Sequence, residues 1–489
     1  MTTITHSLVK IQTSEQSVPS VPVWFGEVTL LVHHLTQQKT LDHINEQVRF
    51  ARRRFGRYET IDFLAVLFGY AISGERTLEA FYQRTKPWAN AFMALFGRDR
   101  LPARSTLSRF LAALDQKTVE NLRAVFLQDL LARPLTKEPQ PGGLWDRQGN
   151  HFFVFDIDGT REAARQRALP MTEDRPAPVR RLRPLCAPGY TGRKRGEVVR
   201  TRTTVLQAHT HQWLATFGNP GNGQYRAELR QAVLVIQSYL QSHSHPEAHA
   251  LLRLDGQYGT GAVLADVAGL SCVVRGKDYQ LLKRAEVQAR LHLPPDQHLT
   301  HPESGLCRSL YDCPELVLGP AKEACRVVIA THPATETRSP IGVTRGGVVY
   351  ELFFTRLSQD AFTASDIVAL YLHRGAFETT LSDEDQEQDP DRWCSQTAHG
   401  QEVWQMVSQW VWNLRLELGH QITSDPVRTT EFAPALLPPL TPATAPAQGY
   451  AKASVALPWK VGRFSGQDFA LQADGTLRCP ADQSLAAQE

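Results

Sequence analysis

Two apolar segments, each running into an aspartate and a glycine, constrain the fold of this chain more than any other feature. Residues 152–160 read Phe-Phe-Val-Phe-Asp-Ile-Asp-Gly-Thr, and residues 250–259 read Ala-Leu-Leu-Arg-Leu-Asp-Gly-Gln-Tyr-Gly. Short apolar runs that end in glycine turns predict buried strands. Because side chains alternate along a strand, Asp156 and Asp158 are expected on one face of the sheet. Carboxylates at a strand end are typical of a functional site, although a single example also serves as a turn cap.

The segments around these strands alternate between strand and helix patterns. In chain order they are strands at 203–207 and 212–217, a helix at 227–240, the strand 250–254, a helix at 261–267, a strand ending in Arg275 and Lys277, and a strand at 349–355. This order predicts an α/β fold, with a mixed sheet and helices packed on it. Between about 278 and 348 the sequence has no regular strand or helix pattern, which predicts an insertion into that core.

Residues 21–135 are expected to be helical and to form the main part of an N-terminal all-α domain. Apolar residues recur there at spacings of three and four, for example through 61–68 and 119–131. A helix that follows Pro102 and is capped by Ser105 would show Arg104 and Arg109 near its start, as a groove-reading helix does. An ordinary bundle helix with exposed arginines explains the same segment equally well.

Length and composition indicate several domains. A chain of 489 residues exceeds what one hydrophobic core usually supports. Pro- and Gly-rich text at 135–150, and a Pro/Ala/Thr-rich stretch after 426, predict three regions: helical and DNA-binding at 1–140, α/β at 150–420, and a linker with a tail at 421–489. No apolar run reaches the roughly 18 residues of a membrane span, and residues 1–20 lack the order of a secretory signal, so a cytoplasmic protein is expected.

Positive charge is concentrated locally, since the formal net charge is only +3. The segment 161–202 is rich in arginine and contains Arg193, Lys194 and Arg195 between glycines. Such a segment suits a loop lying along a phosphate backbone. A solvated charged loop is the common alternative, but it normally mixes signs more evenly. The seven cysteines are scattered without a C-x2-C pair, which favours structural thiols over a metal site.

A phenol, a guanidinium and a carboxylate recur at helical spacing further along. Tyr371, Arg374 and Glu378 stand at i, i+3 and i+7, so a single helix beginning at Ser365 would place them on one face. A guanidinium fork suits a phosphodiester, and a carboxylate suits Mg²⁺. A solvated Arg/Glu pair would explain this segment taken alone. The acidic run 383–391 that follows predicts an exposed loop.

Taken together, these residues resemble the DDE transposases of bacterial insertion sequences, which have an RNase H-like core and a Y-x2-R-x3-E signature. The resemblance implies that Asp158, Asp255 and Glu378 are the catalytic acids and the ligands of two Mg²⁺ ions, with Mn²⁺ as a substitute. It also implies that Tyr371 and Arg374 belong to the DNA-contacting set. The chain departs from the pattern at Asp385, where the family usually has a lysine seven residues after the glutamate.

The same resemblance implies a fold and partners. The expected fold is an RNase H-like mixed sheet flanked by helices, with a mostly β insertion and an N-terminal all-α domain. The expected partners are double-stranded DNA, as terminal inverted repeats and target, and a second copy of the chain in a DNA-end complex, with no membrane. A nucleoid-associated location would follow. Arg193, Lys194, Arg195, Arg275, Lys277, Arg104 and Arg109 are the further candidate DNA contacts.

Two other functions remain open at the level of sequence. Residues 154–160 also resemble the first motif of haloacid-dehalogenase-type phosphatases, in which Asp156 would be the nucleophile and Asp158 the general acid/base. A catalytically inactive, element-derived protein that only binds DNA would keep the basic segments without needing the acids to converge.

Overall fold

The chain divides into two units in the computed structural model. The residues described are 3–6, 9–12, 20–48, 58–135, 144–163, 172–174, 185–189, 197–301, 304–319, 323–334, 342–422, 470–471 and 477–478. Unit 1 comprises Met1–Val125, Arg392–Ser395 and His399–Ser408; unit 2 comprises Phe126–Asp391, Gln396–Ala398 and Gln409–Glu489. Two strand pairs stand apart from the sheet described below: β1 (Thr3–His6) with β2 (Val9–Gln12), and β15 (Ala470–Leu471) with β16 (Leu477–Arg478).

Helices build the globular part of unit 1. They are α1 (Phe25–Gln37), α2 (Thr40–Gln47), α3 (Thr60–Ser73), α4 (Leu78–Thr85), η2 (Lys86–Trp88), α5 (Ala89–Leu95), α6 (Arg104–Ala113) and the first part of α7 (Gln116–Ala132). The apolar helix α3 is buried over nearly its whole length. At Gly69 a β-carbon would lie 2.5 Å from Cζ of Phe92, so the missing side chain lets the helices approach closely. The expected all-α region is confirmed.

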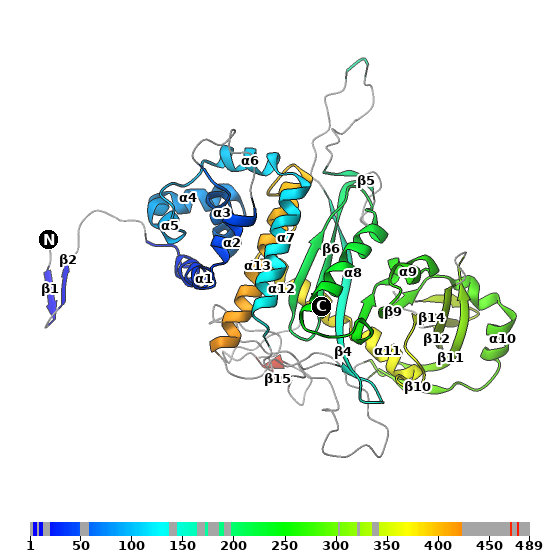
Figure 1. Ribbon diagram of the computed structural model, residues 1–489. Helices are drawn as coiled ribbons and strands as arrows, with labels where there is room; N and C mark the ends of the chain where they lie inside the picture. Colours follow the sequence, from blue (N-terminus) through cyan, green and yellow to red (C-terminus); the bar gives the residue numbers. More distant parts are fainter. Residues whose placement is uncertain are drawn as a thin grey trace. The chain divides into compact units, whose positions relative to one another are not determined.

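One mixed sheet of twelve strands organises unit 2 (Figure 1). Its strands are β3 (Leu144–Trp145), β4 (His151–Ala163), β5 (Ala187–Gly189), β6 (Glu197–Gln207), β7 (Gln212–Phe217), β8 (Ala250–Leu254), β9 (Ser271–Gly276), β10 (Gln297–Thr300), β11 (Cys307–Leu318), β12 (Glu323–Pro333), β13 (Val343–Arg345) and β14 (Val348–Thr355).

The central strands have the order and directions of an RNase H-like sheet. β7 pairs antiparallel with β6, and β6 pairs antiparallel with β4. β4 then pairs in parallel with β8, and β8 in parallel with β9. Parallel neighbours need a crossover, and helices α8 (Tyr225–Ser242) and α9 (Gly261–Asp266) supply the two crossovers. The expected RNase H-like mixed sheet is confirmed by this topology.

The insertion extends the same sheet. β14 pairs antiparallel with β9, and β12, β11 and β10 follow in turn, each antiparallel to its neighbour. The short elements η5 (Tyr279–Lys283) and α10 (Ala285–Leu291) precede β10. The insertion is therefore mostly β, as expected, and it continues the core sheet rather than forming a separate sheet.

Alternation along β4 separates two hydrophobic layers. Phe153, Phe155 and Ile157 pack into the core that contains α8 and α9. Phe152 and Val154 pack into the opposite core, which contains α11 (Ala364–Leu372). On this second face a smaller cluster joins the sheet to α12 (Gly375–Glu387) and α13 (Ala398–Ile422). Asp156 and Asp158 continue the even-numbered series, so they belong to the α11 face.

Among the described residues, no helix has both the length and the apolar character that crossing a membrane requires.

Candidate active site

Asp158 and Asp255 are brought together by the register of two parallel strands. The last residues paired between β4 and β8 are Ile157 and Leu254; Asp158 is the next residue of β4, and Asp255 is the first residue after β8. The Gly159 amide donates to Asp158 Oδ1 at 2.7 Å, and the Gln257 amide donates to Asp255 Oδ1. The register therefore sets the two carboxylates side by side at one sheet edge, although 97 residues separate them in sequence.

The third acid, Glu378, lies in the first turn of α12. The expectation of a single helix through Tyr371, Arg374 and Glu378 is wrong, because α11 ends at Leu372 and α12 begins at Gly375. Between them the Arg374 amide bonds to the Tyr371 carbonyl at 3.0 Å, and the Ala376 amide bonds to the His373 carbonyl at 3.1 Å. Hydrogen bonds from i to i+3 tighten the chain at this point and separate the two helices.

Arg374 joins the acids across this break. Its Nη2 lies 2.6 Å from Asp158 Oδ2, and its Nη1 lies 3.5 Å from Glu378 Oε1. The guanidinium carbon also lies 5.3 Å from the centre of the Phe377 ring. Arg374 is only 9% exposed, whereas the Glu378 side chain is 61% exposed. A buried cation thus lies between a carboxylate of the sheet and a carboxylate of the helix.

The charges of neighbouring carboxylates contribute to the pKa shifts of Asp158 and Glu378. Burial raises the pKa of Asp158, Arg374 opposes that shift, and the charge of Asp255 adds to it. Partial burial raises the pKa of Glu378 as well, again opposed by Arg374 and reinforced by Asp158 and Asp255. Like charges held close together favour protonation or a neutralising cation. The acids therefore form one electrostatic cluster with a shortage of positive charge.

The residues present fit a hard divalent cation in kind and in charge. Carboxylate oxygens are the ligands that Mg²⁺ prefers, and burial together with neighbouring carboxylates raises the pKa of Asp158 and of Glu378, which is the environment that a bound cation would neutralise. Within the described parts of the chain, no three His, Cys, Asp or Glu side chains already stand as a ready-made metal-ligand group. Arg374 bonds to Asp158 Oδ2 at 2.6 Å.

Asp156, the alternative acid on β4, has a different role. Its two oxygens accept hydrogen bonds from Nε of Arg253 at 2.8 Å and from Nη2 at 2.6 Å. The two side chains are 1% and 0% exposed. A carboxylate held on both oxygens inside the core cannot act as a nucleophile toward a phosphate ester. The geometry therefore argues against the phosphatase interpretation, which requires Asp156 to react.

Two of the expected DNA contacts border the acids. Leu254 is paired with Val274, so Arg275 follows on β9 beside Asp255. Lys277 is exposed, and a β-carbon on Gly256 would lie 2.9 Å from its Cε, so the lysine passes over the turn that follows Asp255. By contrast, Tyr371 is buried, and its ring packs against Phe353 at 5.2 Å. The structure thus places Tyr371 in the core.

The other expected DNA contacts lie elsewhere. Arg104, at the start of α6 in unit 1, forms an exposed ion pair with Glu79 at 2.7 Å. Arg109 is on the same helix and bonds to the Ser105 carbonyl at 3.3 Å. The expected cap is wrong, since Ala103 rather than Ser105 precedes the first turn. Arg193, Lys194 and Arg195 lie outside the described residues.

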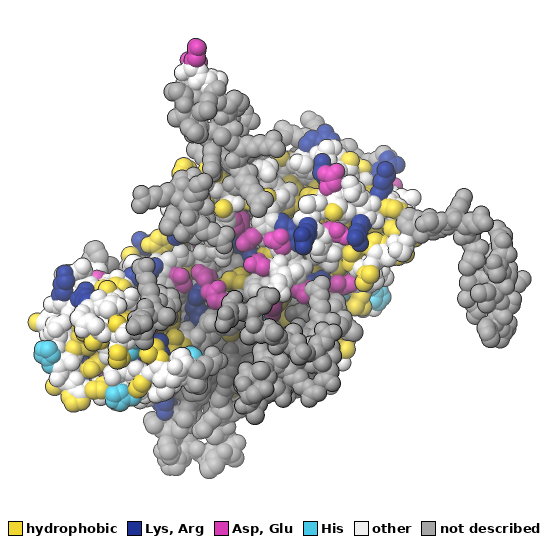
Figure 2. All heavy atoms as spheres, turned by 180° about the vertical axis from the view of Figure 1, so that it is seen from behind, with side chains coloured by type: hydrophobic (Ala, Val, Ile, Leu, Met, Phe, Trp, Pro, Cys, Tyr) yellow, Lys and Arg dark blue, Asp and Glu magenta, His cyan; other side chains and the backbone are white. Residues whose placement is uncertain are grey.

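Charge on the surface is interspersed. Figure 2 shows one face, on which Lys and Arg side chains form small groups, several of them next to Asp and Glu side chains. The described side chains on this face therefore form no single continuous basic patch. Any strong attraction for a polyanion there would have to come from local groups of cations.

An ion pair that the sequence did not predict fixes α12 on the sheet. The run 383–391 was expected to be an exposed loop, but α12 continues to Glu387 and buries Glu384 completely. Both oxygens of Glu384 accept from Nη2 of Arg202 on β6, at 2.9 and 2.7 Å. Phe377, Thr380 and Glu384 stand at helical spacing, which places them on one face of α12. This spacing is the sequence signal that could have indicated the burial of Glu384.

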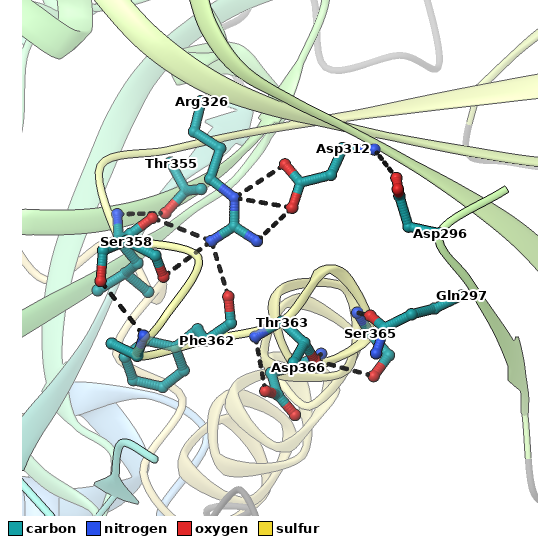
Figure 3. A network of polar contacts seen from close by, with 12 residues as sticks. Asp296, Gln297, Asp312, Arg326, Thr355, Ser358, Phe362, Thr363, Ser365 and Asp366 are labelled. Atoms are coloured by element: carbon teal, nitrogen blue, oxygen red, sulfur yellow. Dashed lines mark hydrogen bonds and ion pairs between the residues drawn. The ribbon is translucent and has the colours of Figure 1, made fainter. Parts of the chain in front are cut away.

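A second network holds the start of α11 (Figure 3). Arg326 on β12 pairs with Asp312 on β11 at 2.7 Å. Its Nη1 donates to the carbonyls of Leu357, Ser358 and Phe362 at 3.0, 3.1 and 2.8 Å. These carbonyls belong to the loop that leads from β14 into α11. The extended sheet thereby positions the helix that precedes Arg374.

The first turn of α11 is tied down at three further points. Thr363 and Asp366 form a capping box, in which Asp366 accepts from the Thr363 amide at 2.8 Å. Asp366 also pairs with Arg147 at 2.7 Å. The Ser365 amide donates to Gln297 Oε1 at 2.9 Å (Figure 3). Helix α11 therefore begins at a fixed place on the sheet.

Comparisons with known proteins add one distant likeness. No protein-family model and no curated protein matches the sequence. One matching solved structure is the cryo-EM structure of the piggyBac transposase synaptic complex with hairpin DNA. The two chains are 11% identical, the match covers 81% of this chain and 76% of that chain, and the TM-score is 0.40. A likeness at this level assigns neither a family nor a function to the chain.

Proposed function

We propose that the chain is a DDE transposase of the insertion-sequence type, which hydrolyses phosphodiester bonds at the ends of a DNA element and transfers the freed strands. The observation that carries the proposal is that Arg374 faces both Asp158 and Glu378, while Asp255 comes directly after the strand that pairs in parallel with β4. Asp158 lies within β4, Asp255 comes directly after its parallel neighbour β8, and Glu378 is linked to Asp158 through Arg374. This arrangement supports one site built from acids that are far apart in sequence.

The chemistry of the cluster suits phosphoryl transfer. Two bound Mg²⁺ ions, or Mn²⁺ in their place, would activate the attacking hydroxyl or water and offset charge on the leaving oxygen. Asp158, Asp255 and Glu378 would hold them through oxygen atoms. The protein's further contribution would be to fix the phosphodiester, and Arg275, Lys277 and Arg374 supply cations beside the acids for this role.

The proposed substrates are double-stranded DNA, with terminal inverted repeats at the element ends and a separate target. Base-independent attraction would come from arginine and lysine contacts to phosphates. Helix α6, with Arg104 and Arg109, is the proposed element that contacts the repeat. We further propose that two copies of the chain act together, because two element ends must be cut and joined in one event.

The decisive experiment is a cleavage assay on a plasmid that carries the native DNA flanking the gene on both sides. With MgCl2, the wild type should cut at two discrete positions. Asp255→Asn should abolish cutting while leaving binding to the same DNA intact, since it removes a proposed metal ligand without enlarging the site. Glu286→Gln, a charge-matched change at an exposed residue, should cut like the wild type.

Each contrary result has a definite meaning. Cleavage that survives Asp255→Asn would remove Asp255 from the site and defeat the proposal. A wild type that binds this DNA but leaves it intact with both MgCl2 and MnCl2 would favour the inactive, element-derived DNA-binding protein instead.

A further inference from the structure

Arg374 is largely buried, and two of its guanidinium nitrogens face carboxylates of the site. Nη2 bonds to Asp158 Oδ2 at 2.6 Å, and Nη1 faces Glu378 Oε1 at 3.5 Å. The remaining donor, Nε, is buried and has no hydrogen-bond partner among the described residues. The plane packs over the Phe377 ring, 5.3 Å from its centre. One guanidinium thus has an internal carboxylate partner and a donor left over.

We propose that Asp158 binds Arg374 while no metal is present, and that a divalent cation bound by the carboxylates frees Arg374 to bind a DNA phosphate. Binding of the metal would then come before tight binding of DNA. This inference rests on the proposed function, and it concerns the regulation of the same site.

Competition for the same oxygen atoms drives the exchange. Asp158 Oδ2 and Glu378 Oε1, the oxygens that now face Arg374, are among those that a cation bound by these two acids would take. Arginine cannot escape by losing its proton, so a displaced guanidinium stays charged. A charge that is only 9% exposed and unpaired is costly, and the protein relieves that cost only when another anion arrives.

A phosphate is well matched to the released group. It accepts two parallel hydrogen bonds from a guanidinium edge, including one from Nε, which has no partner in the present arrangement. The contact with the Phe377 ring limits the freedom that the guanidinium would lose on binding. The same residue therefore serves as a counter-ion without metal and as a phosphate contact with metal.

Asp255 provides a matched control, because it belongs to the same cluster but does not bond to Arg374. Its Oδ1 accepts from the Gln257 amide instead. Asp158→Asn and Asp255→Asn each remove one negative charge from the cluster and change the general attraction for DNA equally. Only Asp158→Asn takes away the partner of Arg374.

The test measures the affinity for a fluorescein-labelled linear DNA duplex of random sequence, by anisotropy, in EDTA or in CaCl2. The wild type should bind about tenfold more tightly in CaCl2, the size expected for one charge-assisted hydrogen-bond pair. In EDTA, Asp158→Asn should bind about tenfold more tightly than Asp255→Asn. Its log-log salt slope should also be steeper by about one, since one more phosphate is neutralised. Arg374→Gln should show no gain with CaCl2.

Equal affinities and equal salt slopes for the two Asp→Asn variants in EDTA would overturn the inference, while cleavage by the wild type would leave the proposed function standing. A wild type that binds no duplex in either condition and cuts no plasmid would overturn both. If Asp158→Asn does not fold, Arg374→Gln decides alone, because a full gain with CaCl2 in that variant contradicts the exchange.

Discussion

Arg202 and Glu384 form an ion pair inside the protein, with Nη2 2.7 Å from Oε2 and side-chain exposures of 1% and 0%. Arg202 comes from β6, and Glu384 comes from the helix that carries Glu378. Asp391 adds a second acceptor for Arg202 at 3.2 Å. A buried pair of this kind contributes little net stability, but it specifies where the helix lies. The position of Glu378 thus depends on a contact six residues further along α12.

Removing only the cation of this pair should destabilise unit 2. Arg202→Met leaves Glu384 buried without its partner, at a cost of about 3–5 kcal/mol. The double variant Arg202→Met with Glu384→Leu should recover most of that loss, because no buried charge remains. The midpoint of thermal unfolding measures both. A double variant no more stable than Arg202→Met alone would show that the pair itself contributes the stability.

The stability of the protein should also fall with rising pH through Glu384. Burial raises the pKa of Glu384 from 4.5 to about 7, against the opposing effect of Arg202. The folded state therefore holds a proton that the unfolded chain releases between these values. The resulting stability is present below pH 4.5 and is lost as the pH rises through about 7.

The comparison that isolates this effect is the wild type against Glu384→Gln, which cannot titrate. The wild type should lose stability relative to the variant as the pH rises from 4.5 to 7. Thermal unfolding at several pH values tests this. Parallel curves for the two proteins would mean that Glu384 keeps the same pKa in both states.

Local patterns predict several of the strands and the faces of β4, although β4 continues through Gly159 to Ala163 where a glycine turn was expected. The alternation in residues 152–157 separates the two cores of β4, and the glycine turn after Asp255 marks the end of β8. The three acids were named from spacing and resemblance. Their approach to one another depends on parallel pairing of β4 with β8, a non-local contact that no periodicity encodes.

The errors have the same physical origin. The acidic run 383–391 looked solvated because its cation, Arg202, lies 182 residues from Glu384. The break between α11 and α12 was missed because nothing before Gly375 forbids a helix; the chain simply changes to i to i+3 bonds. Pairing across long separations and small changes in hydrogen-bond register are decided by tertiary packing, so sequence patterns did not predict them.

Asp156 should prove structural and Asp255 functional. Asp156→Asn leaves the fully buried Arg253 without its carboxylate and should destabilise the protein by about 3–5 kcal/mol. Asp255→Asn should leave thermal unfolding nearly unchanged, since Asp255 has no ion pair among the described residues. Unfolding midpoints for the two variants measure the contrast. If Asp156→Asn folds with normal stability but no longer cleaves the plasmid, Asp156 would be a candidate for the reacting acid.

The two glycines after Asp255 should differ sharply in their tolerance of alanine. A β-carbon on Gly259 would press directly against the carbonyl oxygen of Arg275, which is backbone and cannot rotate away. One on Gly256 would meet only Cε of Lys277, at 2.9 Å, and that side chain is flexible and exposed.

Gly259→Ala should therefore cost about 1–3 kcal/mol and move Asp255 relative to Arg275, whereas Gly256→Ala should cost about 1 kcal/mol or less. The Lys277 amide, which bonds to the Gly259 carbonyl at 3.2 Å, reports the shift through faster hydrogen exchange in Gly259→Ala. Thermal unfolding and plasmid cutting complete the comparison. Equal losses of stability and of plasmid cutting in the two variants would mean that the whole turn after Asp255 shifts in both. Close packing against β9 would then not set the position of Asp255.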